Sequence, residues 1–393
     1  MPVMGKAGEV FGIFLRLGLT SFGGPIAHLG YFRDEFVERR RWLDDRAYAD
    51  LVALAQFLPG PSSSQVGMGL GLMRAGLPGM AAAWAGFTLP SALALIAVAY
   101  GASLLEGSVA RGITHGLMLA AVGVVAQAVI QMGRALTPDA PRLALGAAAA
   151  IAALLSPGAL MQIGVLLAGG LIGLAVLKPV APGDHVPLQV AISRKAGALS
   201  LALFFLLLLV LPLLAAGGGP GLQLFDIFFR AGSLVFGGGH VVLPLLEAGL
   251  VPRGFIERDV FLAGYGAAQA VPGPLFSFAA YVGAALSEGP RGLIGAAICL
   301  AGMFGPSFLL VPGAMPFWVR LSHLMPARAA MMGVNAAVVG ILAAAFYDPI
   351  VTTAIRGPAD AGIALLAWGA LSFTRLPVWA IVLLCGGAGI LVS

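Results

Sequence analysis

The stretch Gln56-Phe-Leu-Pro-Gly-Pro61 decides how this chain folds, because it interrupts an apolar segment covering about residues 47–73. Proline removes a helical N–H group and clashes with the preceding turn, so a helix ends here. About 12 residues remain on each side of the break. A helix needs about 20 residues to cross the hydrocarbon layer. The two pieces therefore form one discontinuous span or a re-entrant hairpin whose tip lies near the middle of the membrane; a simple packing kink is the alternative.

The same motif returns 213 positions later as Gln269-Ala-Val-Pro-Gly-Pro274. A second duplicated stretch precedes each copy: residues 11–24 and 225–238 are identical at 8 of 14 positions, and both end in Phe-Gly-Gly. Further on, Pro90-Ser91 matches Pro306-Ser307, and Arg111 matches Arg328, at offsets of 216 and 217. The offset between matching residues changes by only a few positions along each half, which indicates a duplicated membrane module. Duplicated halves are typical of secondary transporters.

The composition excludes a soluble enzyme. Of 393 residues, 60% are apolar and only 10% are charged, whereas soluble domains carry roughly 25% charged residues. The formal net charge of +5 is too dispersed for a nucleic-acid surface. The sequence has no phosphate-binding Gly-Lys-Ser/Thr loop, which disfavours direct coupling to ATP. Cys299 and Cys385 have no metal-ligand spacing, so neither a metal nor a cofactor is expected.

The predicted fold is an all-α polytopic membrane protein with two homologous halves and broken or re-entrant helices. Residues 1–180 form the first repeat and residues 222–393 the second; a loop and a linker helix lie between them, in residues 181–221. The apolar segments are 9–32, 47–73, 76–104, 112–133, 142–156, 159–177, 196–216, 222–246, 259–286, 292–313, 327–347, 359–373 and 376–392. Segments 142–156 and 359–373 are short for a full crossing.

Loop charges favour re-entrant segments. If every segment crosses, the two sides hold 12 and 8 loop Lys and Arg residues; if hairpins form at the Pro-Gly-Pro breaks alone, or at the Gly-Gly breaks as well, the split is 15 to 5. Cytoplasmic loops carry the Lys and Arg excess. Parallel halves follow from the first hairpin arrangement and inverted halves from the second. The charged, amphipathic stretch 27–41 would cross lipid badly and favours the second.

The breaks offer ligands for an anion. Pro25 suits a first helical position, and the free N–H groups of a helix start beside glycines attract anions. Three hydroxyls follow Pro61, at Ser62, Ser63 and Ser64, whereas only Ser277 follows Pro274 closely. Gln56 and Gln269 could donate amide hydrogens to an anion or simply join helices.

Arg16 and Arg230 occupy equivalent positions inside apolar segments. An arginine there costs at least about 2.5 kcal/mol, so it should face a cavity or a partner. Its planar fork suits an oxyanion; a structural ion pair, for example with Asp226 or Glu247, is the alternative. The expected binding residues are Arg16, Phe22, Gly23, Gly24, Pro25, Gln56, Pro59, Gly60, Pro61, Ser62, Ser63, Ser64, Arg230, Phe236, Gly237, Gly238, Gly239, His240, Gln269, Pro272, Gly273, Pro274 and Ser277.

Proton coupling has three candidates: His28 and His240, which lie beside the breaks, and Glu247, which ends an apolar stretch. Histidine takes up a proton near neutral pH, although an interfacial histidine satisfied by hydrogen bonds is the simpler interpretation. His115 and His323 lie near segment ends and are expected to be solvated.

Taken together, the paired Phe-Gly-Gly and Gln-x-x-Pro-Gly-Pro motifs, with Arg16 and Arg230 ahead of them, resemble the chromate ion transporter family in its long, two-domain form. The resemblance covers nearly the whole chain. It implies efflux of chromate, or of a sulfate-like oxyanion, across a bacterial inner membrane, chromate resistance, and halves of opposite orientation. An oxyanion channel or a sulfate-type exchanger of the same architecture is the alternative; a membrane enzyme is not expected. A homodimer is compatible with a transporter of this size.

Overall fold

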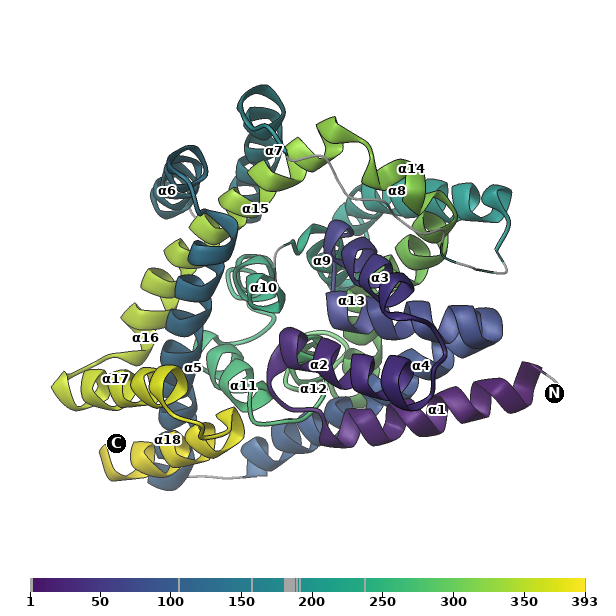
Figure 1. Cartoon of the computed structure of the whole chain (residues 1–393). Coiled ribbons are helices and arrows are strands. Elements are labelled where there is room, and N and C mark those ends of the chain that lie inside the picture. Colours follow the sequence, from purple (N-terminus) through teal and green to yellow (C-terminus); the bar gives the residue numbers. More distant parts are fainter. Residues whose placement is uncertain are drawn as a thin grey trace.

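The computed structural model describes residues 3–104, 107–156, 158–179, 188, 190, 192–236 and 238–392, and every regular element within them is helical (Figure 1). The first half contains α1 (Val3–Thr20), α2 (Gly24–Arg33), η1 (Asp34–Arg39), α3 (Asp45–Phe57), α4 (Ser62–Leu104), α5 (Gly107–Leu136), α6 (Ala140–Leu155) and α7 (Ala159–Val176), followed by α8 (Arg194–Ala216). The second half contains α9 (Pro220–Leu234), η2 (Gly239–Val241), α10 (Val242–Leu250), α11 (Arg258–Ala268), η3 (Leu275–Ser277), α12 (Phe278–Ala284), α13 (Gly292–Ala314), η4 (Met315–Phe317), α14 (Trp318–Ser322), α15 (Met325–Ala345), η5 (Phe346–Val351), α16 (Thr352–Ala354), α17 (Pro358–Phe373) and α18 (Val378–Val392).

All four predicted helix breaks are present. They separate α1 from α2, α3 from α4, α9 from η2 and α11 from η3. Gly23, Gly60, Gly238 and Gly273 take positive φ angles in these breaks, of 102°, 115°, 156° and 101°. Side chains with a Cβ atom rarely adopt this region. The paired Gly-Gly and Pro-Gly-Pro motifs therefore fix where the helices stop.

Six helical stretches of the described chain are long and apolar enough to cross a membrane. They include Ser62–Ala102 of α4, which is kinked at Ala75 and Gly76, where the backbone leaves the helical region. This kink separates the expected segments 47–73 and 76–104. The predicted class, an all-helical membrane protein, is confirmed.

Equivalent glycines pack the first helix of each half on a long helix. In the first half α1 crosses α4, where a Cβ atom on Gly86 would lie 2.7 Å from the carbonyl oxygen of Phe11. In the second half α9 crosses α13, where a Cβ atom on Gly302 would lie 2.9 Å from the carbonyl oxygen of Phe225. Small residues allow such close approach between membrane helices.

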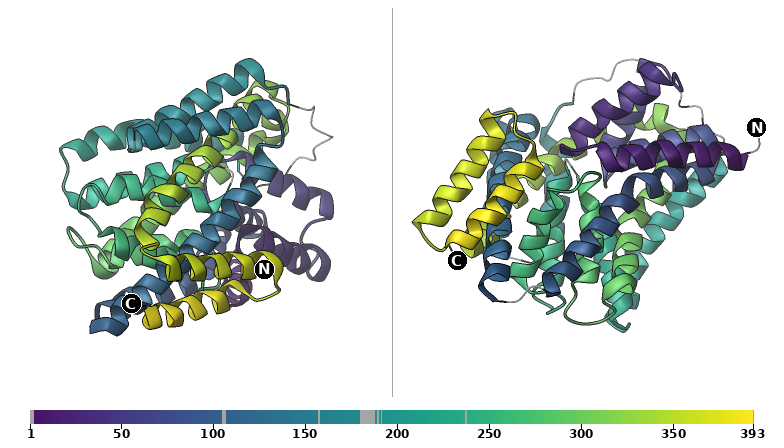
Figure 2. Two further views of the ribbon diagram at one scale, coloured as in Figure 1. Left: turned by 90° about the vertical axis from the view of Figure 1, so that its left-hand side faces the viewer. Right: turned by 90° about the horizontal axis from the view of Figure 1, so that it is seen from below.

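The C-terminal helix pair of each half packs on the other half. α17 and α18 lie along α5, and α6 and α7 lie along α15 (Figure 2). Equivalent glycines again form the contacts: Gly116 of α5 abuts the backbone of Cys385, and Gly333 of α15 abuts the backbone of Gly169. The two halves are therefore interlocked around the central breaks.

Candidate functional site

The four helix breaks meet in two equivalent pairs. The amide of Gly273 donates a 2.9 Å hydrogen bond to the carbonyl of Ser21, and the amide of Gly60 donates a 2.8 Å hydrogen bond to the carbonyl of Val235. Residues 21 and 235 correspond in the repeat, as do residues 60 and 273. Each Pro-Gly-Pro turn thus holds the Phe-Gly-Gly break of the opposite half.

A serine from a long helix lies under each Pro-Gly-Pro turn. A Cβ atom on Gly60 would lie 3.1 Å from Ser307 Oγ, and one on Gly273 would lie 2.9 Å from Ser91 Oγ. Only glycine leaves room for these hydroxyls. In the first half Gln65 Nε2 also donates to the carbonyl of Pro59, at 2.6 Å, and to Ser307 Oγ, at 3.1 Å.

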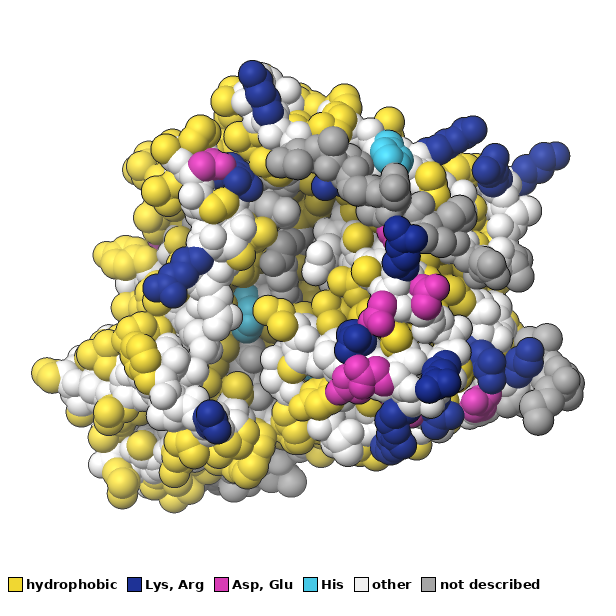
Figure 3. All heavy atoms as spheres, in the orientation of Figure 1, with side chains coloured by type: hydrophobic (Ala, Val, Ile, Leu, Met, Phe, Trp, Pro, Cys, Tyr) yellow, Lys and Arg dark blue, Asp and Glu magenta, His cyan; other side chains and the backbone are white. Residues whose placement is uncertain are grey.

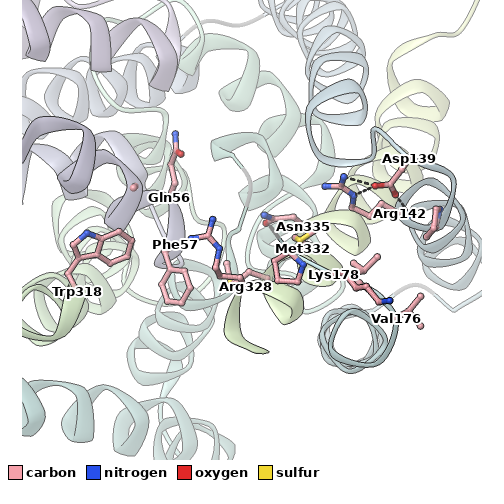
Figure 4. Close-up of a pocket in the computed structure, with 15 residues that line it drawn as sticks. Gln56, Phe57, Asp139, Arg142, Val176, Lys178, Trp318, Arg328, Met332 and Asn335 are labelled. Carbon is pink, nitrogen blue, oxygen red and sulfur yellow. Dashed lines mark hydrogen bonds and ion pairs between the residues drawn. The ribbon is translucent and has the colours of Figure 1, made fainter. Parts of the chain in front are cut away.

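A cavity of about 770 Å³ opens beside the Pro-Gly-Pro turn of the first half (Figure 4). The face seen in Figure 3 is hollowed at its centre and carries Lys and Arg side chains around it. The cavity is lined from the end of α3, the start of α6, the chain after α7, α14 and the first turns of α15. Its residues are Ala53, Gln56, Phe57, Asp139, Pro141, Arg142, Val176, Leu177, Lys178, Pro179, Trp318, Arg328, Met331, Met332 and Asn335.

The cavity lining is positively charged. Three basic residues, Arg142, Lys178 and Arg328, face one acid, Asp139. Arg142 donates to Asp139 through Nη2 at 2.6 Å, and this hydrogen bond lowers the pKa of the Asp139 carboxyl below its ordinary value. Arg328 donates to the carbonyl of Ser322 at 3.2 Å and lies between Phe57 and Asn335 in Figure 4.

The cavity lining also includes uncharged polar side chains. Gln56 is exposed there, in the last turn of α3, directly ahead of the Pro-Gly-Pro turn. Asn335 Oδ1 is buried and has no hydrogen-bond partner. That oxygen is an acceptor and does not bind an anion; the NH2 groups of Gln56 and Asn335 are the amide donors that an oxyanion could use. This arrangement suits an anion that enters along the basic rim and is dehydrated stepwise.

The equivalent face of the other half is closed. There α11 packs on α5, and a Cβ atom on Gly266 would overlap the carbonyl oxygen of Leu117. The repeat partners of these two residues are Ala53 of α3 and Val334 of α15. Ala53 lines the cavity instead, and α3 stands apart from α15 in Figure 1. Gln269, the partner of Gln56, is half-buried and its Nε2 is unpaired.

Both duplicated arginines are ion-paired. Arg16 Nη2 lies 2.6 Å from Glu35 Oε2, with half of its side chain exposed; Arg230 Nη2 lies 2.6 Å from Asp226 Oδ2 and is mostly buried. The pair with Asp226 is one of the two alternatives that the sequence suggested. Glu247, the other suggested partner, instead pairs with Arg258 at 3.1 Å.

The carboxylates that pair with the two arginines lie at positions that do not correspond in the repeat. Glu35 corresponds to Gly249 in the second half, and Asp226 corresponds to Gly12 in the first. Glu35 is 3% exposed and is also bound by Arg39 and Arg40. Burial raises its pKa, but the Arg40 hydrogen bond and the three arginine charges outweigh burial and lower the pKa below its ordinary value. Whether Arg16 and Arg230 bind substrate stays a prediction.

The other expected binding residues lie around the breaks. Phe22 faces Trp379 of α18, with ring centroids 6.5 Å apart, and Phe236 packs on the core. Ser277 Oγ donates a hydrogen bond to the carbonyl of Pro274. His240 Nδ1 is hydrogen-bonded with the hydroxyl of Tyr265. Gly237 lies outside the described residues. Gly23 is exposed, Gly24, Pro25, Pro59, Ser62, Gly238, Pro272 and Gly273 are half-buried, and Gly60, Pro61, Ser63, Ser64, Gly239 and Pro274 are buried.

Sequence reasoning missed the basic residues of the cavity and misjudged one histidine. Arg328 had a usable signal, because it is repeated as Arg111. Arg142 and Lys178 had none. His115 is buried, not solvated: its Nε2 lies 2.8 Å from Asp360 Oδ1 of α17. That expectation was wrong because α17 comes from the opposite half and covers α5.

Comparison with known proteins agrees with this architecture. The sequence profile of a family described as "Chromate transporter" matches residues 8–174 and 222–390, one match in each half. The chain is 30% identical over 399 residues to "Chromate transport protein" of Pseudomonas aeruginosa, covering 98% of this chain and 92% of that protein. It is 27% identical over 363 residues to "Chromate transport protein" of Cupriavidus metallidurans, covering 90% and 84%. No solved structure matches. The chain belongs to the chromate transporter family and is a membrane transporter, not an enzyme.

Proposed function

We propose that this protein exports chromate, and other tetrahedral oxyanions of the sulfate type, by alternating access. One observation carries the proposal: two faces that correspond in the repeat are in opposite states, with α3 apart from α15 and α11 packed on α5. Transporters built from related halves change access when one part moves against the other about a central site. The curated relatives named above are chromate transport proteins.

The substrate path begins in the cavity and ends at the breaks. Arg142, Lys178 and Arg328 attract a dianion to the rim, and Gln56 and Asn335 offer amide donors deeper in. Beyond Gln56 lie the turn at Gly60 and the buried start of α4, whose free N–H groups favour negative charge. The glycines, the hydroxyls after Pro61 and the glutamines are the proposed ligands at the centre.

Arg16 and Arg230 serve this site indirectly in our proposal. Each must leave a carboxylate before it can bind substrate directly, and Glu35 is held by two further arginines. An arginine paired within a membrane protein is far less costly than an unpaired one. The geometry therefore favours arginines that hold α1 and α9 in position ahead of the breaks.

The proposed orientation has the N-terminus in the cytoplasm, re-entrant hairpins at all four breaks and inverted halves. The end of α7 and the start of α15 then lie on the cytoplasmic side, so the cavity opens to the cytoplasm. The arginine-rich residues 33–46 lie on the same side, which holds 15 of the 20 loop Lys and Arg residues. This follows the positive-inside rule for a bacterial inner membrane.

Export of a dianion needs no ATP. Moving one charge through 100 mV is worth about 2.3 kcal/mol, so a dianion leaving a cell with a negative interior gains roughly 4–5 kcal/mol per 100 mV. A cytoplasm-facing cavity with a closed opposite face is the loading state that such an exporter requires.

Flux measurements test the proposal. Inverted vesicles containing the protein are given chromate, sulfate or molybdate under a set membrane potential, and uptake is compared with that of empty vesicles. We expect saturable chromate uptake that increases as the vesicle interior is made more positive. Unsaturable passive flux would identify a channel, and uptake that requires sulfate inside the vesicles would identify an exchanger. Absence of any oxyanion flux would overturn the proposal.

A further inference from the structure

The junction where Gly273 meets Ser21 is built from buried polar side chains. His28 of α2 is 1% exposed, and its Nδ1 lies 3.3 Å from Oγ of Ser63, which is 3% exposed. Ser21 is 1% exposed and accepts the Gly273 amide through its carbonyl. The His28 ring also meets the Phe87 ring edge to face, with centroids 5.1 Å apart. We call Ser21, His28 and Ser63 the polar junction.

The same place in the second half is apolar. The repeat partners of Ser21, His28 and Ser63 are Val235, Val242 and Phe276. All three are buried, at 1%, 1% and 4% exposure. The backbone contact is nevertheless the same, since the Gly60 amide donates to the carbonyl of Val235. The fold therefore does not need polar side chains at this position.

Polar side chains at the first junction are also costly. His28 Nε2 and Ser21 Oγ are buried without a hydrogen-bond partner, as are Ser64 Oγ and Thr88 Oγ1 nearby on α4. A buried polar group without a hydrogen-bond partner destabilises the folded state. Valine and phenylalanine form the equivalent junction without this cost. The imidazole Nε2 thus has no side-chain partner, although the ring lies against the backbone of Ser21.

Most charged groups of the elements around α2 pair with one another; Lys6, Asp34 and Arg46 also lie on these elements. Arg16, Arg39 and Arg40 form ion pairs with Glu35, Arg33 with Glu38 and Asp45, and Arg74 with Glu9. Tyr48 donates a hydrogen bond to the carbonyl of Leu29, and Trp318 donates one to Asp50. Among the described residues, the partners of His28 are the Ser63 hydroxyl, the backbone of Ser21 and the Phe87 ring. No carboxylate of the described chain is paired with His28, so a charge on it calls for a mobile anion.

We propose that His28 binds a proton when an oxyanion occupies the transport site, so that the polar junction couples proton binding to anion binding. This inference rests on the proposed function. The link is the α3–α4 hairpin, which carries Gln56 in the cavity and Ser63 against His28 on either side of one Pro-Gly-Pro turn. A dianion at this turn, in surroundings of low dielectric, favours the charged imidazolium. Coupling between two sites is reciprocal.

The sign of the effect follows from this linkage. If the anion-bound state holds more protons than the free state, a lower pH tightens anion binding. Uptake of one full proton corresponds to about a tenfold gain in affinity per pH unit in the range where His28 titrates. The equivalent position of the opposite half contributes nothing to this dependence, because Val242 has no ionisable group.

Calorimetry on the full-length protein in lipid nanodiscs tests the coupling. Sulfate, a tetrahedral dianion that is not an oxidant, is titrated at neutral pH in two buffers of different ionisation enthalpy, which gives the protons taken up per anion. We expect up to one proton for the unmodified protein and none for His28→Val, which copies the second half. His28→Gln keeps a polar side chain that cannot titrate and should also take up none. His323→Gln, at an exposed position, should behave like the unmodified protein.

The outcomes separate the two proposals. Sulfate binding without proton uptake, or equal uptake in the unmodified protein and in a folded His28→Gln variant, would overturn the coupling and leave the transport function standing. Failure of the unmodified protein to bind sulfate or chromate would overturn both. Loss of binding together with loss of proton uptake in both His28 variants would mean that His28 is a ligand rather than a coupled site.

Discussion

The face between α3 and α15 and the face between α11 and α5 are built from the same repeated module, yet they differ in the position of one short helix. At the closed face, Gly266 lets α11 touch the backbone of α5 at Leu117. At the open face, a cavity of about 770 Å³ takes the place of that contact. The breaks themselves keep the same hydrogen bonds in both halves.

Under the proposed alternating access, this difference indicates which parts of the molecule move and which stay. The glycine-mediated packing of α1 on α4 and of α9 on α13 is the same in both halves, so it belongs to the rigid frame. The α3 and α11 helices are the parts whose environment differs. The proposed exchange has α3 close on α15 and α11 leave α5, and it brings Arg111, the partner of Arg328, to an outer cavity.

The largest effect is expected from a substitution that prevents one face from closing. Gly266→Val places methyl groups against the backbone of Leu117, so α11 cannot pack on α5. We expect transport to fall at least about a hundredfold, because the barrier to leakage and the loading state are both lost. Flux in inverted vesicles measures this loss. Ala53→Val, at the equivalent open position, has room in the cavity and should fold with an unchanged melting temperature while slowing transport. Full transport by Ala53→Val would mean that α3 never closes on α15.

Cysteines introduced at the two faces should react with a thiol reagent at rates that differ about tenfold. Gln56→Cys is exposed in the cavity, whereas Gln269→Cys is half-buried at the closed face. A membrane-impermeant maleimide added to inverted vesicles should label the first quickly and the second slowly. Cys299 and Cys385 are buried, so the unmodified protein is the blank. Faster labelling of Gln56→Cys in right-side-out vesicles would reverse the proposed orientation.

Removing a basic residue from the rim should have a smaller effect. Arg328→Gln takes away one charge of the open cavity, and we expect the KM for chromate on the cytoplasmic side to rise about five- to tenfold, with a weaker dependence on salt. Arg111→Gln, its partner at the closed face, should leave this KM unchanged. Equal effects of the two variants would contradict the assignment of the cavity as the loading side.

The smallest effect concerns stability. Glu35→Gln leaves Arg16, Arg39 and Arg40 without their shared carboxylate, and we expect a loss of about 1–3 kcal/mol at neutral pH. Because the folded state lowers the pKa of Glu35, its contribution is present above its ordinary pKa of about 4.5 and is lost as pH falls through the lowered value. Melting temperatures at pH 7 and below pH 4 check this. A difference that is already lost at pH 6 would contradict it.

The sequence predicts the helix breaks, but it does not predict every ion-pair partner of the arginines ahead of them. Pro59, Pro61 and their repeats stop a helix through local sterics, so any reader of the sequence can place them. The carboxylate that holds Arg16 had no such signal, since Glu35 is 19 residues away on a separate helix. The sequence suggested Asp226 for an arginine pair because that residue is one helical turn from Arg230. A pair one helical turn apart can be inferred from spacing in the sequence. The angle at which α2 returns along α1 is set by tertiary packing and cannot.

The sequence by itself determined an all-helical membrane chain, its duplication and the four points where helices break, because hydropathy, repetition and backbone sterics are properties of neighbouring residues. Only the tertiary structure decided that the breaks pair across the halves, that Arg328 and Asn335 share a cavity with Gln56, and that His115 is covered by α17. These contacts join residues at least 175 positions apart. Two halves with similar sequences can also differ in whether their equivalent faces are open or closed, and the repeat alone does not indicate which face is open.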